Sequence, residues 1–238
     1  MLPIIEFKSS NQKIGLKART PSNGPEQIFI DEFAFYLCET FKNINGGIAI
    51  FYEPLLETGF PDIVFVQYNP NVYDRWNIDR SKLFSTDLKV LHHLVCKNGL
   101  NSDCLRKQLG IDSKTLITSI ERLLDGGLIK RKNNLWKPYG FNKLFAIKRI
   151  IAVEAKIKNL KSAVQQAEIN RWFASESYIV SPVDNPSEGI LKYSKISGVG
   201  IYSFNKKSIR RIAKSARFQL PCSYASWMFN EWIGRYLQ

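Results

Sequence analysis

Three residues with reactive side chains lie in two apolar, strand-like runs of the sequence. Asp62 opens the run 61–66, and Glu154 and Lys156 lie in the run 150–157. Alternate side chains of a β-strand project from the same face, so Glu154 and Lys156 are expected to point to one side while their neighbours pack on the other. Carboxylate oxygens are ligands that Mg²⁺ prefers, and an ammonium group beside them can orient a water molecule. The pattern predicts a divalent-cation site suited to phosphodiester hydrolysis.

The same Glu-X-Lys spacing also occurs in ordinary ion pairs on the surface of a strand. Such pairs contribute little to stability and carry no chemistry. Here the residues around Glu154 and Lys156 are apolar, and an unpaired charge is costly in an apolar setting. This context favours a functional site over a surface ion pair.

The pattern resembles the PD-(D/E)XK superfamily of restriction-endonuclease-like nucleases. That family places a Pro-Asp before an apolar strand and a Glu-X-Lys on a later strand that a helix follows. Asp62, Glu154 and Lys156 fall on these motif positions. The resemblance implies a nuclease that uses Mg²⁺ or Mn²⁺, with Asp62 and Glu154 as metal ligands and Lys156 positioning the attacking water.

The resemblance also implies two further polar positions in the site. Many members place an acidic residue on the first helix of the core, and Glu32 is the corresponding candidate, with Asp31, Glu39 and Glu53 as alternatives. Many members also line the site with a polar residue from the helix after the Glu-X-Lys strand. In this sequence that residue would be Gln165 or Gln166.

The segment that separates the two halves of the motif has the pattern of a small helical domain. Apolar residues at helical spacing predict helices that begin near Ser85 or Thr86, near Asn101-Ser102 and at Ser113. A short hairpin follows, with Asn133-Asn134 at its turn. This order resembles a winged helix-turn-helix domain, which we expect over residues 83–137.

In a winged helix the third helix can enter the major groove while the hairpin contacts the backbone. The polar and basic residues that we expect to contact nucleic acid in this way are Lys114, Thr115, Thr118 and Arg122 on the helix, and Lys130, Arg131 and Lys132 on the hairpin. Ser119 is also expected off the apolar face of that helix. Winged helices serve as protein-docking modules as well, so the alternative is a solvated basic turn beside a docking surface.

The remaining segments predict an α/β fold. A strand over 48–52, the strand that Asp62 opens, the Glu-X-Lys strand, a helix over 158–175 and a strand over 178–180 suit a mixed central sheet flanked by helices. The expected fold is therefore a restriction-endonuclease-like domain over residues 1–82 and 138–238, interrupted by the winged helix. A last helix over 223–236 is expected to cover the core.

Composition favours a polyanionic partner. Lys and Arg outnumber Asp and Glu by 34 to 21, for a formal net charge of +13. The stretch 189–230 contains no acidic residue and has eight basic ones, Lys192, Lys195, Lys206, Lys207, Arg210, Arg211, Lys214 and Arg217. We expect a DNA partner, with RNA as the alternative. A solvated face of a basic protein would give the same pattern.

Other classes of protein are disfavoured. The four cysteines form no Cys-X-X-Cys pair and the only two histidines are adjacent, a spacing that fits no common zinc site. Both histidines also lie in the segment expected to be the inserted domain, away from any candidate nucleophile, which disfavours a Ser-His hydrolase. The sequence has neither the layout of a signal peptide nor an apolar run that could span a bilayer, so we expect a cytoplasmic protein without a membrane partner. Cutting both strands of a duplex usually requires two sites, which makes a homodimer an expectation.

Two alternatives to a DNA endonuclease share these motifs. One is a catalytically silent DNA-binding regulator or docking protein. The other is an RNA-directed nuclease or a subunit of a larger defence complex. Intact Asp62, Glu154 and Lys156 favour an active enzyme over the first alternative.

Overall fold

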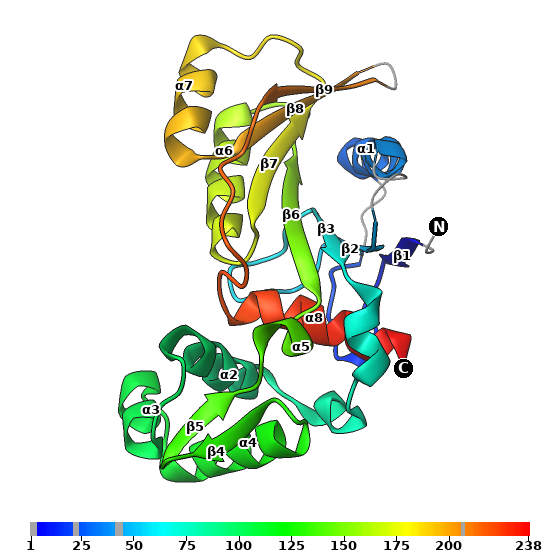
Figure 1. The fold of residues 1–238 in the computed structure, drawn as a ribbon. Helices are drawn as coiled ribbons and strands as arrows, with labels where there is room; N and C mark the ends of the chain where they lie inside the picture. Colours follow the sequence, from blue (N-terminus) through cyan, green and yellow to red (C-terminus); the bar gives the residue numbers. More distant parts are fainter. Residues whose placement is uncertain (1–3, 21–23, 41–44, 206–207) are drawn as a thin grey trace. The chain divides into compact units, whose positions relative to one another are not determined.

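Apolar runs of the sequence form one mixed sheet in the computed structural model, which describes residues 4–20, 24–40, 45–205 and 208–238. Within these residues the sheet has seven strands in the order β1-β2-β3-β6-β7-β8-β9 (Figure 1). The strands are β1 (Ile4–Phe7), β2 (Gly47–Tyr52), β3 (Ile63–Tyr68), β6 (Ile147–Ala155), β7 (Glu176–Ser181), β8 (Gly200–Asn205) and β9 (Ser208–Ala213). Parallel pairs (β1–β2, β6–β7, β7–β8) occur beside antiparallel ones (β2–β3, β8–β9). The expected mixed α/β architecture is confirmed at this level.

Helices cover both faces of this sheet. Helix α1 (Pro25–Thr40) packs on one face against apolar residues of β2, β3, β6, β7 and β8. Helices α6 (Leu160–Ile169) and α7 (Glu188–Ser197) lie on the opposite face (Figure 1). Val153 and Ala155 belong to the α1 side, whereas Ile179, which is paired with Glu154, belongs to the α6 side. Glu154 therefore projects from the opposite face to its two neighbours, as the strand period requires.

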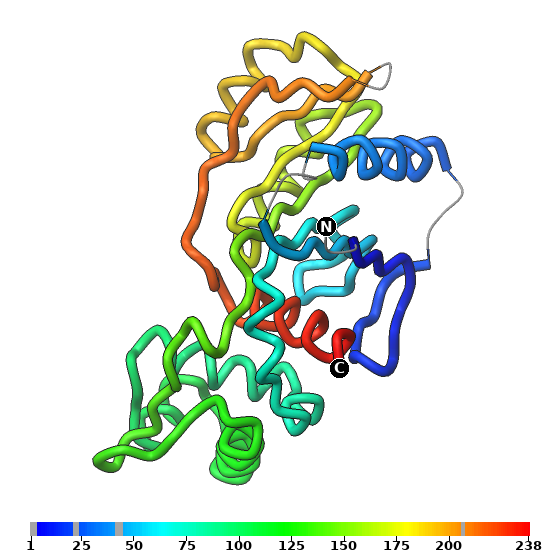
Figure 2. Tube along the Cα trace, turned by 45° about the vertical axis from the view of Figure 1, so that its right-hand side comes forward, coloured from blue at the N-terminus to red at the C-terminus, as the bar shows by residue number. Residues whose placement is uncertain are grey.

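Strands β3 and β6 are neighbours in the sheet although residues 69–146 separate them along the chain (Figure 2). The backbone N–H of Ala155, the last residue of β6, donates to Asp62 Oδ2 at 2.8 Å. Asp62 directly precedes β3. The sheet thus brings the beginning of β3 beside the end of β6, and with them the two halves of the predicted motif.

The chain between β3 and β6 contains three longer helices and a hairpin. These elements are α2 (Ser85–Lys97), α3 (Ser102–Leu109), α4 (Ser113–Asp125), β4 (Ile129–Lys132) and β5 (Leu135–Pro138). Asn101 and Asp112 cap α3 and α4 through their side chains. Asn133 and Asn134 form the hairpin turn with positive φ angles of 49° and 59°, as a two-residue turn between antiparallel strands requires. Each element lies where the sequence pattern places it.

The chain divides into two compact units. One contains Met1–Tyr68 and Lys148–Cys222, and the other contains Asn69–Ile147 and Ser223–Gln238. The second unit holds, besides the three helices and the hairpin, the short elements η2 (Pro70–Arg75), η3 (Ile78–Lys82) and α5 (Phe141–Leu144), and the last helix α8 (Tyr224–Leu237). It is thus larger than the segment 83–137 on which the domain expectation was based.

Helix α8 joins the second unit through specific packing. The indole of Trp76 fills the space beside Gly234, where a Cβ atom would lie 2.2 Å from the ring. Trp227 makes edge contacts with Phe141 and Phe145. The amphipathic pattern of this helix predicted a buried face, but only the fold shows that α2 and η3 lie against it.

Several local expectations need correction. The helix expected over 158–175 ends at Ile169 and continues as the short element η4 (Asn170–Trp172). Helix α2 is capped by the carboxylate of Asp87, which accepts from the N–H of Phe84, and not by Ser85 or Thr86. Lys206 and Lys207 of the basic stretch lie outside the described residues. No helix in the described part of the chain has the length and apolar character needed to cross a bilayer.

Substitution of Gly200 in β8 tests how closely the sheet is packed. A Cβ atom at this position would lie 2.2 Å from the ring of Tyr178 and 2.7 Å from the backbone nitrogen of Ser215. We expect Gly200→Ala to lower the free energy of unfolding by about 2 kcal/mol, because neighbouring backbone must move. Gly189→Ala in α7 is the control, since its Cβ meets nothing within 4 Å, and should gain about 0.5 kcal/mol. Equal effects of the two substitutions in urea denaturation would contradict this packing.

Candidate active site

The carboxyl groups of Asp62 and Glu154 lie next to each other and share a hydrogen bond. Each is also fixed by a nitrogen donor of the protein. The Ala155 N–H donates to Asp62 Oδ2 at 2.8 Å, and the Asn170 side-chain amide donates to Glu154 Oε1 at 2.6 Å. Two acids that are far apart in the sequence are thus held in a single arrangement.

The surroundings of this pair favour protonation when no cation is present. Glu154 is buried, with 4% of its surface exposed. Burial, followed by the negative charge of Asp62, raises its pKa to about 8. Burial also raises the pKa of Asp62, although the Ala155 N–H and the charge of Lys156 oppose that effect. The two carboxyls therefore hold a proton between them near neutral pH, and a bound divalent cation would take its place.

Lys156 lies directly after β6 beside the two acids. Its backbone N–H donates to the Val180 carbonyl at 3.0 Å, which extends the strand pairing by one residue and fixes the direction of the side chain. Its ammonium group contacts Glu26 Oε2 at 3.4 Å and stays partly open to solvent, with 24% of the side chain exposed. Glu26 belongs to the first turn of α1. The site therefore combines two carboxylates, one ammonium group and a third, more exposed carboxylate.

Glu53 forms the edge of the same site. Its N–H donates to the Asp62 carbonyl at 3.1 Å, and its carboxylate pairs with Arg19 at 3.1 Å. Burial raises the pKa of Glu53, and the charge of Arg19 only partly offsets this effect. Glu53 has a φ of 41°, a left-handed conformation that is uncommon for a residue other than glycine. The backbone accepts this conformation directly after β2, where the chain turns toward Asp62.

The structure brings Asp62, Glu154 and Lys156 together but not every residue that the resemblance suggested. Glu32 is exposed on α1, and the acid of that helix that reaches Lys156 is Glu26. Asp31 accepts a hydrogen bond from Gln27 on the same helix. Among the alternatives weighed for the first helix, Glu53 is the one whose charge acts on Asp62 and Lys156.

Gln165 and Gln166 are exposed on α6, and the polar side chain from this region that contacts the site is Asn170. A continuous helix over 158–175 gave no reason to single out Asn170. The helix ends there, and Asn170 becomes 96% buried against Glu154. Glu26 was missed for a related reason, because it lies in the first turn of α1, ahead of the apolar segment 29–37 that predicted the helix.

The residues expected to contact nucleic acid divide into two groups. Lys114, Lys130, Arg131 and Lys132 are exposed. Arg122 instead pairs with the buried carboxylate of Asp87 at 3.4 Å and covers the ring of Phe84. Thr115 and Thr118 use their hydroxyls to hydrogen-bond within the α4 region, and Ser119 is buried, contrary to expectation.

The site fits a hard divalent cation by the chemistry of its donors. Asp62 and Glu154 offer carboxylate oxygens, and burial is the main reason that the pKa values of both are raised, with the negative charge of Asp62 as a further cause for Glu154. Mg²⁺ is commonly held by one or two carboxylates and keeps several waters. In the described residues no group of three or more His, Cys, Asp or Glu side chains is arranged to hold a metal, so water and substrate oxygens would complete the coordination.

The buried carboxyl pair predicts how stability depends on pH in the metal-free protein. The folded-state pKa of Glu154 lies near 8 and its ordinary value is 4.5. The stability that comes from its protonated form is present below about pH 4.5 and is lost as pH rises through about 8. Glu154→Gln is always neutral, so we expect it to be more stable than the parent at pH 8 by up to about 4 kcal/mol, with little difference at pH 4.5.

Urea denaturation with a chelator at several pH values measures this difference. Glu168→Gln, an exposed position on α6, is the control and should follow the parent at every pH. A Glu154→Gln protein that is less stable than the parent at pH 8 would contradict the shared proton.

Comparisons with models of known protein families, with curated proteins and with solved structures gave no match for this chain. The inference about function therefore depends on the residues themselves. The features that carry it are the carboxyls of Asp62 and Glu154, the ammonium group of Lys156 and the fold that brings them together.

Proposed function

We propose that this protein is a Mg²⁺-dependent DNA endonuclease of the PD-(D/E)XK type. The observation that carries the proposal is the contact between the carboxyls of Asp62 and Glu154, with Lys156 beside them. An ordinary surface ion pair would not place the buried carboxyl of Glu154 against that of half-buried Asp62, from which residues 69–146 separate it along the chain. Placing two acids side by side at such a position is unfavourable without a cation or proton to stabilise them, and such costs are typical of functional sites.

Each residue has a role in this mechanism. When bound, the cation would polarise the scissile phosphate and lower the pKa of a water molecule. Asp62 and Glu154 would hold that cation, and Asn170 would keep Glu154 in a fixed rotamer through its 2.6 Å hydrogen bond. Lys156 would orient the attacking water and offset charge that develops on the phosphate. Glu26 would hold the ammonium group of Lys156 in place through its 3.4 Å contact.

The order of elements in the first unit agrees with this proposal. Helix α1, the antiparallel pair β2–β3, strand β6, helix α6 and the parallel strand β7 follow one another around the site. Asp62 precedes β3, and Glu154 lies on β6. The PD-(D/E)XK resemblance implies this succession, and the same resemblance supplies Mg²⁺ or Mn²⁺ as the cofactor.

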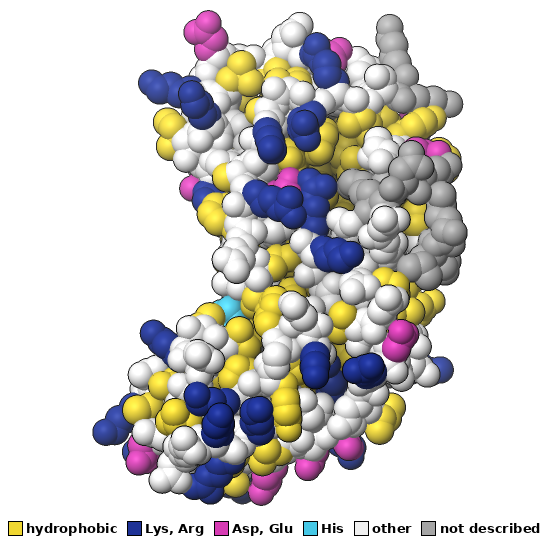
Figure 3. Space-filling model, viewed as in Figure 1, with side chains coloured by type: hydrophobic (Ala, Val, Ile, Leu, Met, Phe, Trp, Pro, Cys, Tyr) yellow, Lys and Arg dark blue, Asp and Glu magenta, His cyan; other side chains and the backbone are white. Residues whose placement is uncertain are grey.

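DNA as the substrate is supported by the distribution of positive charge. Lys and Arg side chains gather on the visible face of the unit that holds the seven-stranded sheet (Figure 3). The exposed residues of the basic stretch include Lys192, Lys195, Arg211 and Lys214. In the second unit we propose that α2 to β5 form a winged helix, whose exposed Lys114, Lys130, Arg131 and Lys132 would contact phosphates. A homodimer would supply the two sites needed to cut a duplex.

Isosteric substitutions test the catalytic assignment. We expect Asp62→Asn and Glu154→Gln to lower the rate of Mg²⁺-dependent plasmid cleavage by at least about 100-fold, because each removes a charged oxygen ligand. Lys156→Met should lower the rate by a similar factor, whereas Lys158→Met, exposed two residues away, should retain it. DNA binding in the presence of a chelator should be unchanged. Parental cleavage by both acid variants would show that the site is assigned wrongly.

Single-stranded DNA and RNA substrates in the same assay separate the DNA endonuclease from an RNA-directed nuclease. Binding of DNA without cleavage by the parent protein, with either Mg²⁺ or Mn²⁺, would favour the silent regulator.

A paired substitution on α1 tests which acid supports Lys156. Glu26 contacts the ammonium group, and Glu32 is exposed without a contact to it. We expect Glu26→Gln to slow cleavage about tenfold by releasing Lys156, and Glu32→Gln to leave the rate within about twofold. Rates measured at saturating and limiting Mg²⁺ would show whether the acid acts through Lys156 or through the cation. Slower cleavage by Glu32→Gln alone would contradict the geometry.

A further inference from the structure

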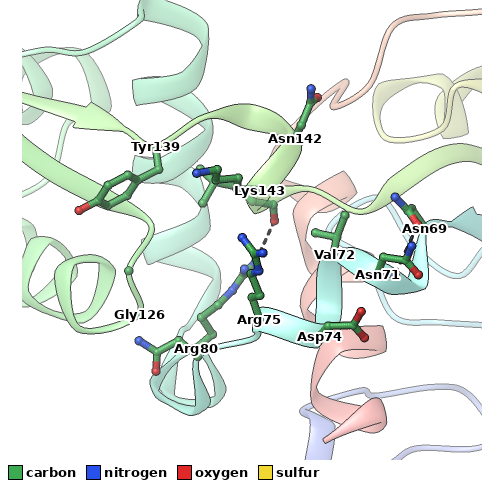
Figure 4. Close-up of a pocket in the computed structure, with 13 residues that line it drawn as sticks. Asn69, Asn71, Val72, Asp74, Arg75, Arg80, Gly126, Tyr139, Asn142 and Lys143 are labelled. Carbon is green, nitrogen blue, oxygen red and sulfur yellow. Dashed lines mark hydrogen bonds between the residues drawn. The ribbon is translucent and has the colours of Figure 1, made fainter.

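A cavity of about 660 Å³ lies within the second unit, apart from the carboxyl pair. It is lined mainly by polar and basic residues from η2, the loop to η3, the turn after α4 and the segment around α5 (Figure 4). The lining includes Arg75, Arg80, Lys143, Tyr139 and Asn142. Small-molecule sites in proteins commonly have volumes of about 300–1,000 Å³, so this cavity is large enough for more than a single phosphate.

Arg80 is a rigid part of the cavity wall. It is 4% exposed, and its guanidinium donates to both carboxylate oxygens of Glu231, at 3.1 and 2.6 Å, and to the Leu144 carbonyl at 3.1 Å. The same group lies 3.7 Å from the centre of the Trp76 ring. Its second terminal nitrogen, Nη1, has no partner among the described residues and is not fully enclosed. A buried cationic group with a free donor therefore borders the cavity.

Two further cations border the same space. Arg75 and Lys143 are exposed, and their side chains form no ion pair or hydrogen bond with any other residue that the structure describes. In Figure 4 both side chains lie near Arg80 in the view, and Asp74, the acidic residue of the lining, lies to the right of Arg75. Because Glu231 already neutralises Arg80, Arg75 and Lys143 leave two positive charges that Asp74 offsets only in part, and an anion would balance the remainder.

The rest of the lining suits an aromatic, hydrogen-bonding group. Tyr139 supplies a ring, and the ammonium group of Lys130 lies 5.1 Å from its centre. Asn142 has an amide without a partner among the described residues, and Asn71 offers a second one. Amide side chains can hydrogen-bond the edge of a nucleobase, and aromatic rings stack on its face. Phosphate recognition and base recognition are thus both available in one cavity.

We propose that this cavity binds a nucleoside phosphate, with Arg75, Arg80 and Lys143 on the phosphate and Tyr139 and Asn142 on the base. The bound unit comes either from a free nucleotide or from a nucleotide of a nucleic-acid strand. The proposal goes beyond the nuclease reaction, and every residue that it requires belongs to the second unit. It does not depend on Asp62 or Glu154.

Calorimetric titration of the full-length protein with a chelator present tests the proposal without cleavage. The probes are adenosine and thymidine 5′-monophosphate, a four-nucleotide single strand and inorganic phosphate. We expect a nucleotide probe to bind at least about tenfold more tightly than inorganic phosphate, and the Arg75→Ala/Lys143→Ala double variant to lose at least about tenfold in affinity. Binding of the mononucleotides identifies the free nucleotide as the source, and binding of the four-nucleotide strand alone identifies a nucleic-acid strand.

Control variants separate the cavity from general charge effects. Lys107→Ala and Lys97→Ala remove two positive charges from the same unit outside the cavity lining, and should change affinity less than twofold. Asn142→Ala should weaken the nucleotides but not inorganic phosphate. Absence of nucleotide binding by the parent, equal affinity for nucleotide and phosphate, or equal losses in the cavity and control variants would each overturn the proposal. Melting curves confirm that the exposed substitutions leave the fold intact.

Discussion

The contact between the first residue before β3 and the last residue of β6 determines the rest of the candidate active site. The Ala155 N–H holds one oxygen of Asp62, and the neighbouring Glu154 is thereby brought against the same carboxyl. Two carboxyls in a largely buried position repel each other when both are ionised. The sheet stabilises this arrangement because the strands on either side are packed through apolar faces that α1 and α6 cover.

Neighbouring elements compensate for the unfavourable placement of these acids by supplying donors and positive charge. Asn170 reaches Glu154 because α6 ends at Ile169, and Lys156 follows the acid immediately on the chain. Glu53 adopts a left-handed conformation beside Asp62, and strained backbone of this kind persists only where the surrounding structure enforces it. The positions of Asn170, Lys156 and Glu53 around the two acids thus depend on the short stretch where β3 and β6 lie side by side.

The second unit uses a buried ion pair for a different purpose. Arg80 and Glu231 are both almost fully enclosed and face each other at 2.6 Å. A buried pair of this kind adds little net stability, but removing one partner leaves an uncompensated charge. In this protein the Arg80–Glu231 pair fixes positions: it joins η3 to α8, and it holds Arg80 so that one free donor of its guanidinium faces the cavity. The ion pair that packs α8 against η3 thus also positions Arg80 at the proposed anion site.

The sequence by itself determined the local elements and singled out Asp62 and Glu154 as a candidate pair of carboxyls. Alternating polarity around Glu154 and the turn at Asn133-Asn134 are local properties, so strand and hairpin could be predicted. Tertiary structure alone decided that Glu26 and Asn170 join the site, because their contacts depend on where α1 begins and where α6 ends relative to the sheet. The pairing of Arg122 with buried Asp87 and the assignment of α8 to the second unit are likewise long-range outcomes, since side chains distant in sequence supply the contacts that fix them.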